Sequence, residues 1–244
     1  MLARAALLAI PHLVHGFTDR NGGVSRGRFE SLNLGRRWGD EPENVDENLR
    51  RIAEASGFAP EQLRLVRQVH GATALRVSAL TAAAEGDALW ARASDGPLVI
   101  GVMTADCVPV LLADREATAV AAIHSGWRGT VANVVGATVA ALAADGVDPS
   151  QLMAAIGPCI EVEAFEVGEE VASQFAPAHV HREPGARPHV DLVAAVRAQL
   201  ENAGVPKDSI ERVGGCTCSH PERYFSYRRD GAGIGQMLAF IGIR

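Results

Sequence analysis

The chain has 244 residues, of which 48% are hydrophobic and 21% charged, and its formal net charge is −6. This composition is typical of a folded globular protein and excludes a disordered chain. The acidic balance also argues against a general nucleic-acid-binding protein, which normally carries a basic surplus, so we expect no nucleic-acid partner.

The N-terminal segment MLARAALLAIPHLV is apolar, but Pro11 and His12 interrupt it and no A-x-A cleavage site follows. It therefore predicts mature sequence rather than a signal peptide. No apolar run reaches the roughly 18 residues of a membrane span, so we expect no membrane partner. Four cysteines are few for a secreted disulfide scaffold, and reduced thiols in a cytoplasmic protein are the better interpretation.

Helix-type and strand-type patterns alternate along the chain and are separated by turn signals. Apolar spacing predicts helices over 44–56, 130–144 and 191–204. Short apolar runs predict strands over 63–69, 98–104, 108–113, 118–124, 152–157 and 237–243. Several of these runs are apolar on both faces, as expected for a sheet that is covered on both sides. We predict a single mixed α/β domain spanning residues 1–244.

Three metal-binding side chains fall where predicted strands end. His70 closes the run RQVHG, Cys107 interrupts MTADCVPVLLAD, and His124 ends TAVAAIH. Two imidazoles and a thiolate suit zinc, and three protein ligands leave a fourth position for water or substrate. Their wide spacing does not match a zinc-finger pattern, so a buried structural cysteine and a cysteine nucleophile with a histidine base both stay open.

Arginines lie near these residues and could bind an anion. Arg128 follows His124 in HSGWRGT, at the start of a predicted helix, where a guanidinium and free backbone N–H groups suit phosphate. Arg228 lies beside aromatic residues in FSYRRDGAG, and Arg20 and Asn33 lie in the turns TDRNGGVS and SLNLG. A surface charge pair or a purely structural turn explains each of the last three equally well.

The motifs HGFTDRNGGVS, SLNLG, GDEPENVDENLRR, RQVHG, GDALW, TADCVPVLLAD, HSGWRGT, IGPCI, FEVG and YFSYRRD occur in this order. Together they closely resemble the YfiH-like family, formerly called laccase-like polyphenol oxidases and now regarded as purine nucleoside phosphorylases. The resemblance extends over nearly the whole chain. One departure is Gln236, which stands in GIGQ where the family commonly has the arginine of T-G-R; if that arginine contacts substrate, phosphate handling is altered here.

The resemblance implies a layered α/β/β/α sandwich with mixed sheets, shared with certain toxin deamidases. It implies a zinc site formed by His70, Cys107 and His124, which serve as both ligands and catalytic residues. It also implies phosphorolysis of adenosine, inosine and methylthioadenosine, with adenosine deaminase activity. The implied partners are a purine nucleoside and phosphate, with the protein acting as a monomer or small homo-oligomer. An editing role in cell-wall precursor synthesis is an alternative setting.

Residue chemistry limits the remaining alternatives. A multicopper oxidase needs roughly ten histidines with H-x-H pairs, whereas this chain has eight, so copper at a single His₂Cys site is at most a side possibility. A Cys–His hydrolase is the more serious rival, and a non-enzymatic binding module is a third class. Asp87 and Asp106 are candidates for proton transfer, although either would also serve to orient a ligand histidine.

Overall fold

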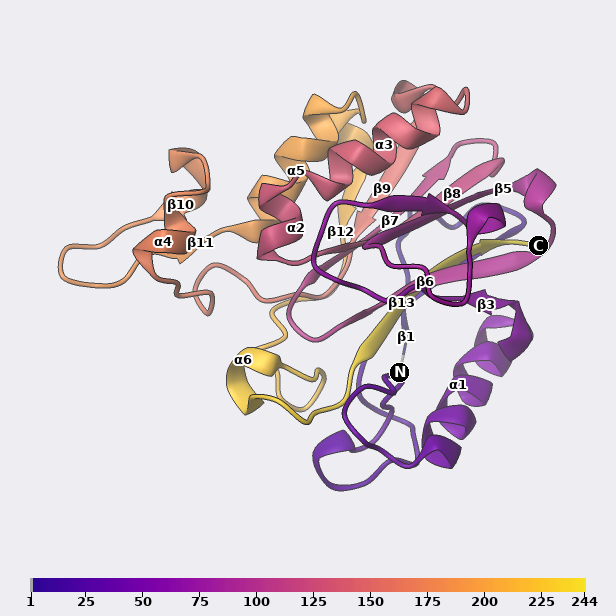
Figure 1. The fold of residues 1–244 in the computed structure, drawn as a ribbon, viewed down its shortest axis with the longest axis horizontal. Helices are drawn as coiled ribbons and strands as arrows, with labels where there is room; N and C mark the ends of the chain where they lie inside the picture. Colours follow the sequence, from indigo (N-terminus) through magenta and orange to yellow (C-terminus); the bar gives the residue numbers. More distant parts are fainter. Residues whose placement is uncertain (1) are drawn as a thin grey trace.

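The computed structural model describes residues 2–244 and contains two mixed β-sheets packed face to face (Figure 1). The first sheet has five strands in the order β1 (Leu2–Ala3), β2 (Leu13–Thr18), β13 (Met237–Ile243), β6 (Leu98–Thr104) and β3 (Leu63–Arg64). The second has six strands in the order β12 (Ile210–Arg212), β9 (Leu152–Ile156), β7 (Val108–Asp114), β8 (Ala119–Ser125), β5 (Ala88–Arg92) and β4 (Ala74–Arg76). A parallel pair lies at one edge of the first sheet and at both edges of the second. The prediction of a mixed α/β fold is confirmed.

Helices cover the outer faces of the two sheets. The α-helices of residues 2–244 are α1 (Pro42–Ser56), α2 (Trp127–Val131), α3 (Val134–Ala144), α4 (Glu169–Ala172), α5 (Leu192–Asn202) and α6 (Tyr227–Asp230). Helices α3 and α5 lie on the six-stranded sheet, whereas α1 lies on the five-stranded sheet (Figure 1). A small hairpin, β10 (Val180–His181) with β11 (His189–Val190), extends to one side of this body together with α4.

The central strands are buried on both faces, as β7 illustrates. Val110 and Leu112 point toward α3 and α5, whereas Leu111 and Ala113 point into the space between the sheets. Alternation along a strand sends neighbouring side chains to opposite faces, so both faces of β7 must be apolar. This explains why the strand has no polar face in its sequence.

The structure corrects two of the predicted elements. The predicted helix 130–144 is two helices, because Asn133 adopts a left-handed conformation at φ 60° between α2 and α3. The predicted strand 63–69 ends at Arg64, and beyond it the Gln68 side-chain amide bonds the backbone N–H and C=O of Met103, each at 2.8 Å. The Gln68 side chain therefore makes the two hydrogen bonds to Met103 that the backbone of a neighbouring strand would otherwise make. Strands β2 and β5 lie in segments for which no strand was predicted.

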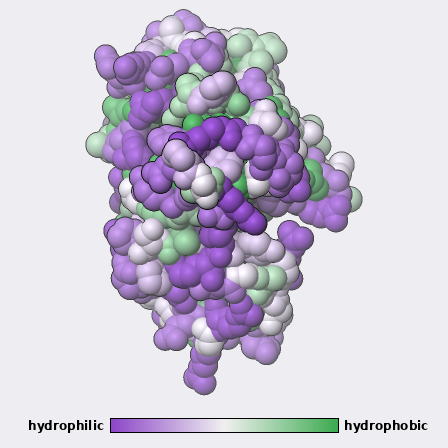
Figure 2. Space-filling model, turned by 90° about the vertical axis from the view of Figure 1, so that its left-hand side faces the viewer, coloured by the Kyte–Doolittle hydropathy of each residue, from purple (hydrophilic) through white to green (hydrophobic). Residues whose placement is uncertain are grey.

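The surface is consistent with these assignments. The face that carries α4 and α6 is mostly hydrophilic, with small separate hydrophobic areas (Figure 2). Among residues 2–244, no helix combines the length and apolar character needed to cross a bilayer. The assignment of the whole chain to one domain stays a prediction.

Candidate metal centre

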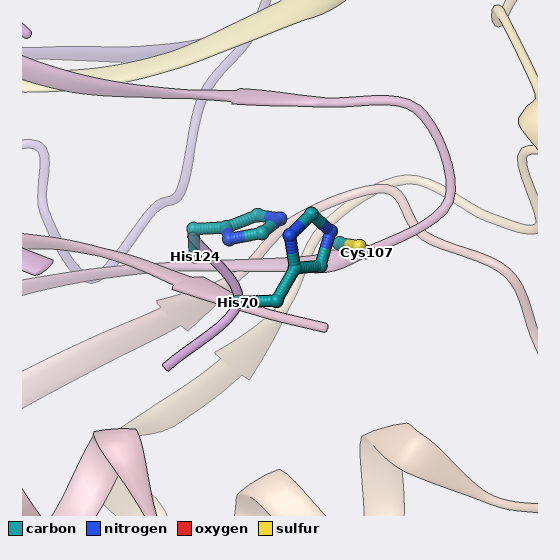
Figure 3. Close-up of side chains that lie close together, drawn as sticks. All are labelled: His70, Cys107 and His124. Atoms are coloured by element: carbon teal, nitrogen blue, oxygen red, sulfur yellow. The ribbon is translucent and has the colours of Figure 1, made fainter. Parts of the chain in front are cut away.

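Three separate segments bring His70, Cys107 and His124 together. His70 lies in the segment that leaves β3 of the first sheet for β4 of the second, and His124 lies near the end of β8. Cys107 lies in the turn from β6 to β7, which also crosses from one sheet to the other. Their ligand atoms all lie within 4.8 Å of one another (Figure 3). The predicted convergence of these three residues is therefore confirmed.

The donor set fits a divalent metal ion. Atoms within 4.8 Å of one another share a centre that is about 2.8 Å or less from each, close to the roughly 2.0–2.3 Å bonds of zinc to nitrogen and sulfur. The His70 and His124 rings meet edge to face with their centroids 4.8 Å apart (Figure 3). His124 is buried, whereas His70 and Cys107 are partly exposed. Two of the three ligands thus lie at the edge of the buried interior and not fully within it.

The buried carboxylate of Asp87 orients two of the three ligands. His124 Nδ1–H donates to Asp87 Oδ1 at 2.8 Å, which leaves Nε2 as the metal-facing nitrogen. The backbone N–H of His70 donates to Oδ1 at 2.9 Å and that of Gly71 to Oδ2 at 2.6 Å. Burial raises the pKa of Asp87, but the hydrogen bonds from His124 and Gly71 outweigh this effect and lower it. Asp87 is therefore held as a carboxylate.

Charge at the three ligands is distributed as in a thiolate–imidazolium pair when no metal is bound. Burial raises the pKa of Cys107, but the charge and hydrogen bond of His124, with a hydrogen bond from His70, bring it down to about 6. Burial lowers the pKa of His124, but the Cys107 thiolate and Asp87 raise it to about 9. A thiolate at neutral pH is the form that binds metal or acts as a nucleophile.

The backbone at the centre is tightly constrained. His70 and Asp106 adopt positive φ values of 62° and 92°, which are uncommon for residues other than glycine. Gly126 is the residue before helix α2 and has an ordinary φ of −72°. A Cβ at Gly126 would lie 2.9 Å from Cys107 Sγ and 3.0 Å from His70 Cδ2. Gly126 is thus required by close approach to the ligands and not by turn geometry.

The three arginines predicted to bind an anion differ in how many of their guanidinium N–H groups already donate hydrogen bonds within the protein. The exposed guanidinium of Arg128 lies 4.2 Å from the Trp127 ring centroid, and within residues 2–244 no carboxylate pairs with it. Arg228 Nη1 donates to the carbonyls of Glu166, at 2.7 Å, and Ala164. Arg20 donates through Nε and Nη1 to the carbonyl oxygens of residues 30 and 221.

Asn33 is 1% exposed, and both ends of its carboxamide are occupied within the protein. Its Oδ1 accepts from the backbone N–H groups of Gly35 and Gln236, and its Nδ2 donates to Gly35 O and to Asp40. The backbone N–H of Gln236 thus joins the same loop contact. A substrate-binding role for Asn33 stays a prediction.

Two features of the site have no counterpart in the sequence analysis. Thr217 and Ser226 donate hydroxyl hydrogen bonds to Asp106, which precedes Cys107. Both hydroxyls are fully buried. Serine and threonine are too common in turns to be recognised from sequence, and the only available signal was that Ser226 lies within the FSYRRD motif.

Known proteins resemble this chain along most of its length. A family model described as "Multi-copper polyphenol oxidoreductase laccase" matches residues 14–244. A Deinococcus radiodurans protein named purine nucleoside phosphorylase is 43% identical over 99% of this chain and 92% of its own length. An Escherichia coli protein named purine nucleoside phosphorylase YfiH is 38% identical over 92% of this chain and 91% of its own. The crystal structure of YlmD from Geobacillus stearothermophilus has a TM-score of 0.89 and 33% identity, covering 98% of this chain and 94% of that one.

Proposed function

Because the chain belongs to the multi-copper polyphenol oxidoreductase laccase family, which includes YfiH, we propose that it is a zinc-dependent purine nucleoside phosphorylase. The reaction would transfer ribose from the purine to phosphate, yielding ribose 1-phosphate and the free base. The relatives' names support the reaction class. The observation that carries the proposal is the convergence of His70, Cys107 and His124. Arg128, which pairs with no carboxylate in the described part of the chain, follows His124 by four residues.

Zinc is the metal that best fits this set of two imidazoles and one thiolate, with copper a weaker candidate. When bound, such an ion acts as a Lewis acid and lowers the pKa of a coordinated water to about 7. That property would support the deamination of adenosine at purine C6. The protein's own part is to present His124 Nε2, through the bond from Nδ1–H to Asp87, and to hold Cys107 as a thiolate.

Phosphate binding is assigned first to Arg128, because its guanidinium has no hydrogen-bond acceptor among residues 2–244. It lies in the first turn of α2, where backbone N–H groups also face outward. Arg228 and Arg20 each use some of their N–H groups on carbonyl oxygens and retain others for a ligand. These cations would hold phosphate in place and neutralise its charge against the ribose.

The test is incubation of the purified protein with adenosine, inosine or methylthioadenosine, with and without phosphate. We expect phosphate-dependent formation of ribose 1-phosphate and free base, together with inosine and ammonia from adenosine. His70→Ala and Cys107→Ala should lose at least 100-fold of either activity, and Arg128→Ala should raise the phosphate KM about tenfold or more. Absence of phosphate-dependent base release, or full turnover by His70→Ala, would refute the proposal.

A Cys–His hydrolase is the second candidate, and the pKa values of about 6 for Cys107 and about 9 for His124 favour it. A cysteine nucleophile with one histidine base explains only two of the three converging residues, whereas a bound metal ion explains all three. Metal content separates the two functions. About one zinc per chain in protein purified without added metal supports the phosphorylase, whereas metal-free protein that is active and is inactivated by iodoacetamide supports the hydrolase.

A further inference from the structure

The turn that carries Cys107 is fixed by the carboxylate of Asp106. Asp106 is 8% exposed, and both of its oxygens accept hydrogen bonds from residues more than 100 positions away. Thr217 Oγ1 donates to Oδ1 at 2.5 Å, and Ser226 Oγ donates to Oδ2 at 3.1 Å. The backbone N–H of Arg228 donates to Oδ2 at 2.6 Å. The carboxylate therefore joins the Cys107 turn to the first turn of helix α6.

Further bonds extend this connection to the rest of the site. The backbone C=O of Asp106 accepts from Ile160 N–H at 2.9 Å, and Thr217 N–H donates to Cys159 O at 2.9 Å. Helix α6 in turn holds Arg228, whose guanidinium lies 5.2 Å from the Phe165 ring centroid and donates to the carbonyl of Glu166. A single side chain thus links a metal ligand to a segment that carries a candidate phosphate-binding arginine.

Proton transfer does not fit these surroundings. Three donors already occupy the carboxylate, and none of them is a ligand histidine. Among residues 2–244, the hydrogen-bond donors to this carboxylate are two hydroxyls and one backbone N–H, so it has no direct contact through which to pass a proton to a ligand histidine. Asp106 also adopts φ 92°, so its turn needs a residue that tolerates a positive φ.

We propose that Asp106 is a positioning residue, whose carboxylate holds the Cys107 turn against helix α6 so that the thiolate and Arg228 face the same substrate. This inference rests on the proposed phosphorylase function for its kinetic part. Its structural part, the placement of the thiolate, does not depend on that function.

Three substitutions separate the contributions of Asp106. Asp106→Gly removes the carboxylate but keeps a residue that adopts positive φ without strain. Asp106→Asn keeps the shape, because its amide oxygen accepts from Arg228 N–H while its NH₂ donates to Thr217 Oγ1. Asp114 offers a matched control at the other end of β7. It is also 8% exposed and accepts three hydrogen bonds from Thr118 and Ala119.

The kinetic readout is the phosphate KM in the zinc-loaded enzyme. We expect Asp106→Gly to raise it at least tenfold, Asp106→Asn to raise it less than threefold, and Asp114→Gly to leave it unchanged. In an Arg228→Ala background, Asp106→Gly should raise the phosphate KM little further, because both changes remove the contact between the Arg228 guanidinium and phosphate. Equal loss of kcat in Asp106→Asn and Asp106→Gly, with unchanged phosphate KM, would identify a proton carrier and overturn the proposal.

The second readout needs no turnover. Cobalt(II) bound to Cys107 should give a thiolate-to-metal charge-transfer band, and Asp106→Gly should weaken cobalt affinity about tenfold by chelator competition, whereas Asp114→Gly should not. If the wild-type protein catalyses no phosphorolysis, the proposed function fails while this measurement still decides whether Asp106 positions the thiolate. Cobalt affinity equal in wild type and Asp106→Gly would overturn the inference.

Discussion

Gly126 illustrates how the metal ligands restrict the residues around them. Its backbone conformation is open to any amino acid, yet the space for a side chain is taken by the Cys107 sulfur and the His70 ring. Asp87 restricts the same region electrostatically, because it accepts from His124 and from the backbone beside His70. At the scale of single residues, the metal centre therefore depends on the lack of a side chain at Gly126 and on the buried negative charge of Asp87.

Gly126→Ala should weaken metal binding while leaving the fold intact. The added Cβ would lie 2.9 Å from Cys107 Sγ and 3.0 Å from His70 Cδ2, so both ligands must shift. We expect at least a tenfold loss of zinc affinity, measured by competition with a chromophoric chelator. Gly71→Ala is the matched control, because its Cβ would meet only ordinary contacts of 3.6 Å or more. Equal affinity of the two variants would contradict the steric argument.

The reactivity of Cys107 in metal-free protein should follow its lowered pKa. A thiol with a pKa of about 6 is mostly thiolate at neutral pH, whereas an ordinary cysteine titrates near about 8.5. The rate of alkylation by iodoacetamide should therefore rise between about pH 5 and 7 and then level off. Mass spectrometry of the labelled Cys107 peptide gives this rate directly. His124→Gln removes the stabilising charge and should move the midpoint upward; a midpoint near pH 8.5 in the unsubstituted protein would refute the assignment.

Helices α2 and α3 show how a break in an element serves the site. The short helix α2 places Trp127 and Arg128 directly after β8, and α3 then starts in a new direction from Asn133. Asn133 supplies both the left-handed residue at this break and the side-chain cap, because its Oδ1 accepts from Gly136 N–H at 3.2 Å. If residues 127–144 formed one continuous helix, Arg128 would lie on the axis of α3 and not on the separate axis of α2.

Substitutions of Asn133 should separate its two contributions. Asn133→Ala loses the cap and imposes a left-handed conformation on a residue with a Cβ, so the free energy of unfolding should fall by about 1–2 kcal/mol. Asn133→Gly keeps the conformation and should cost only a few tenths of a kcal/mol. Urea denaturation measures both values. If the glycine variant is as unstable as the alanine variant, conformation is not the cause.

At the scale of the whole molecule, two apolar layers on either side of the six-stranded sheet hold the site's segments in place. One layer lies between this sheet and helices α3 and α5, and the other lies between the two sheets. Two of the three metal ligands, Cys107 and His70, lie where the chain passes from one sheet to the other, at the β6–β7 turn and after β3. Their positions therefore depend on how the two sheets pack.

Leu111→Ala should test the layer between the sheets. Leu111 is fully buried there, and truncating such a side chain typically lowers the free energy of unfolding by about 2–5 kcal/mol. Leu65→Ala is the control, because Leu65 is 42% exposed and should cost about 0.5 kcal/mol or less. Denaturant unfolding of the metal-free proteins compares them. Similar losses for both variants would mean that this layer contributes little to stability.

Local sequence patterns were sufficient for some of the regular elements. The apolar runs over 98–104 and 237–243 correspond to β6 and β13 residue for residue. Helix α1 ends as its sequence indicates, at Gly57 in a left-handed conformation of φ 74°. The motifs also identified His70, Cys107 and His124 as a group. These features are local or follow from the family resemblance, because periodicity and turn residues report which face of a segment is buried.

Only the tertiary structure decided which segments meet. The sequence predicts 98–104 and 108–113 as successive strands, but it does not indicate that they belong to different sheets, as β6 and β7 do. Nor does the sequence indicate that Asp106 bonds to Thr217, Ser226 and Arg228, or that Asn33 is occupied within its own loop. An apolar pattern specifies that a face is buried but not against what, and a polar side chain's partner is chosen only when distant segments pack together.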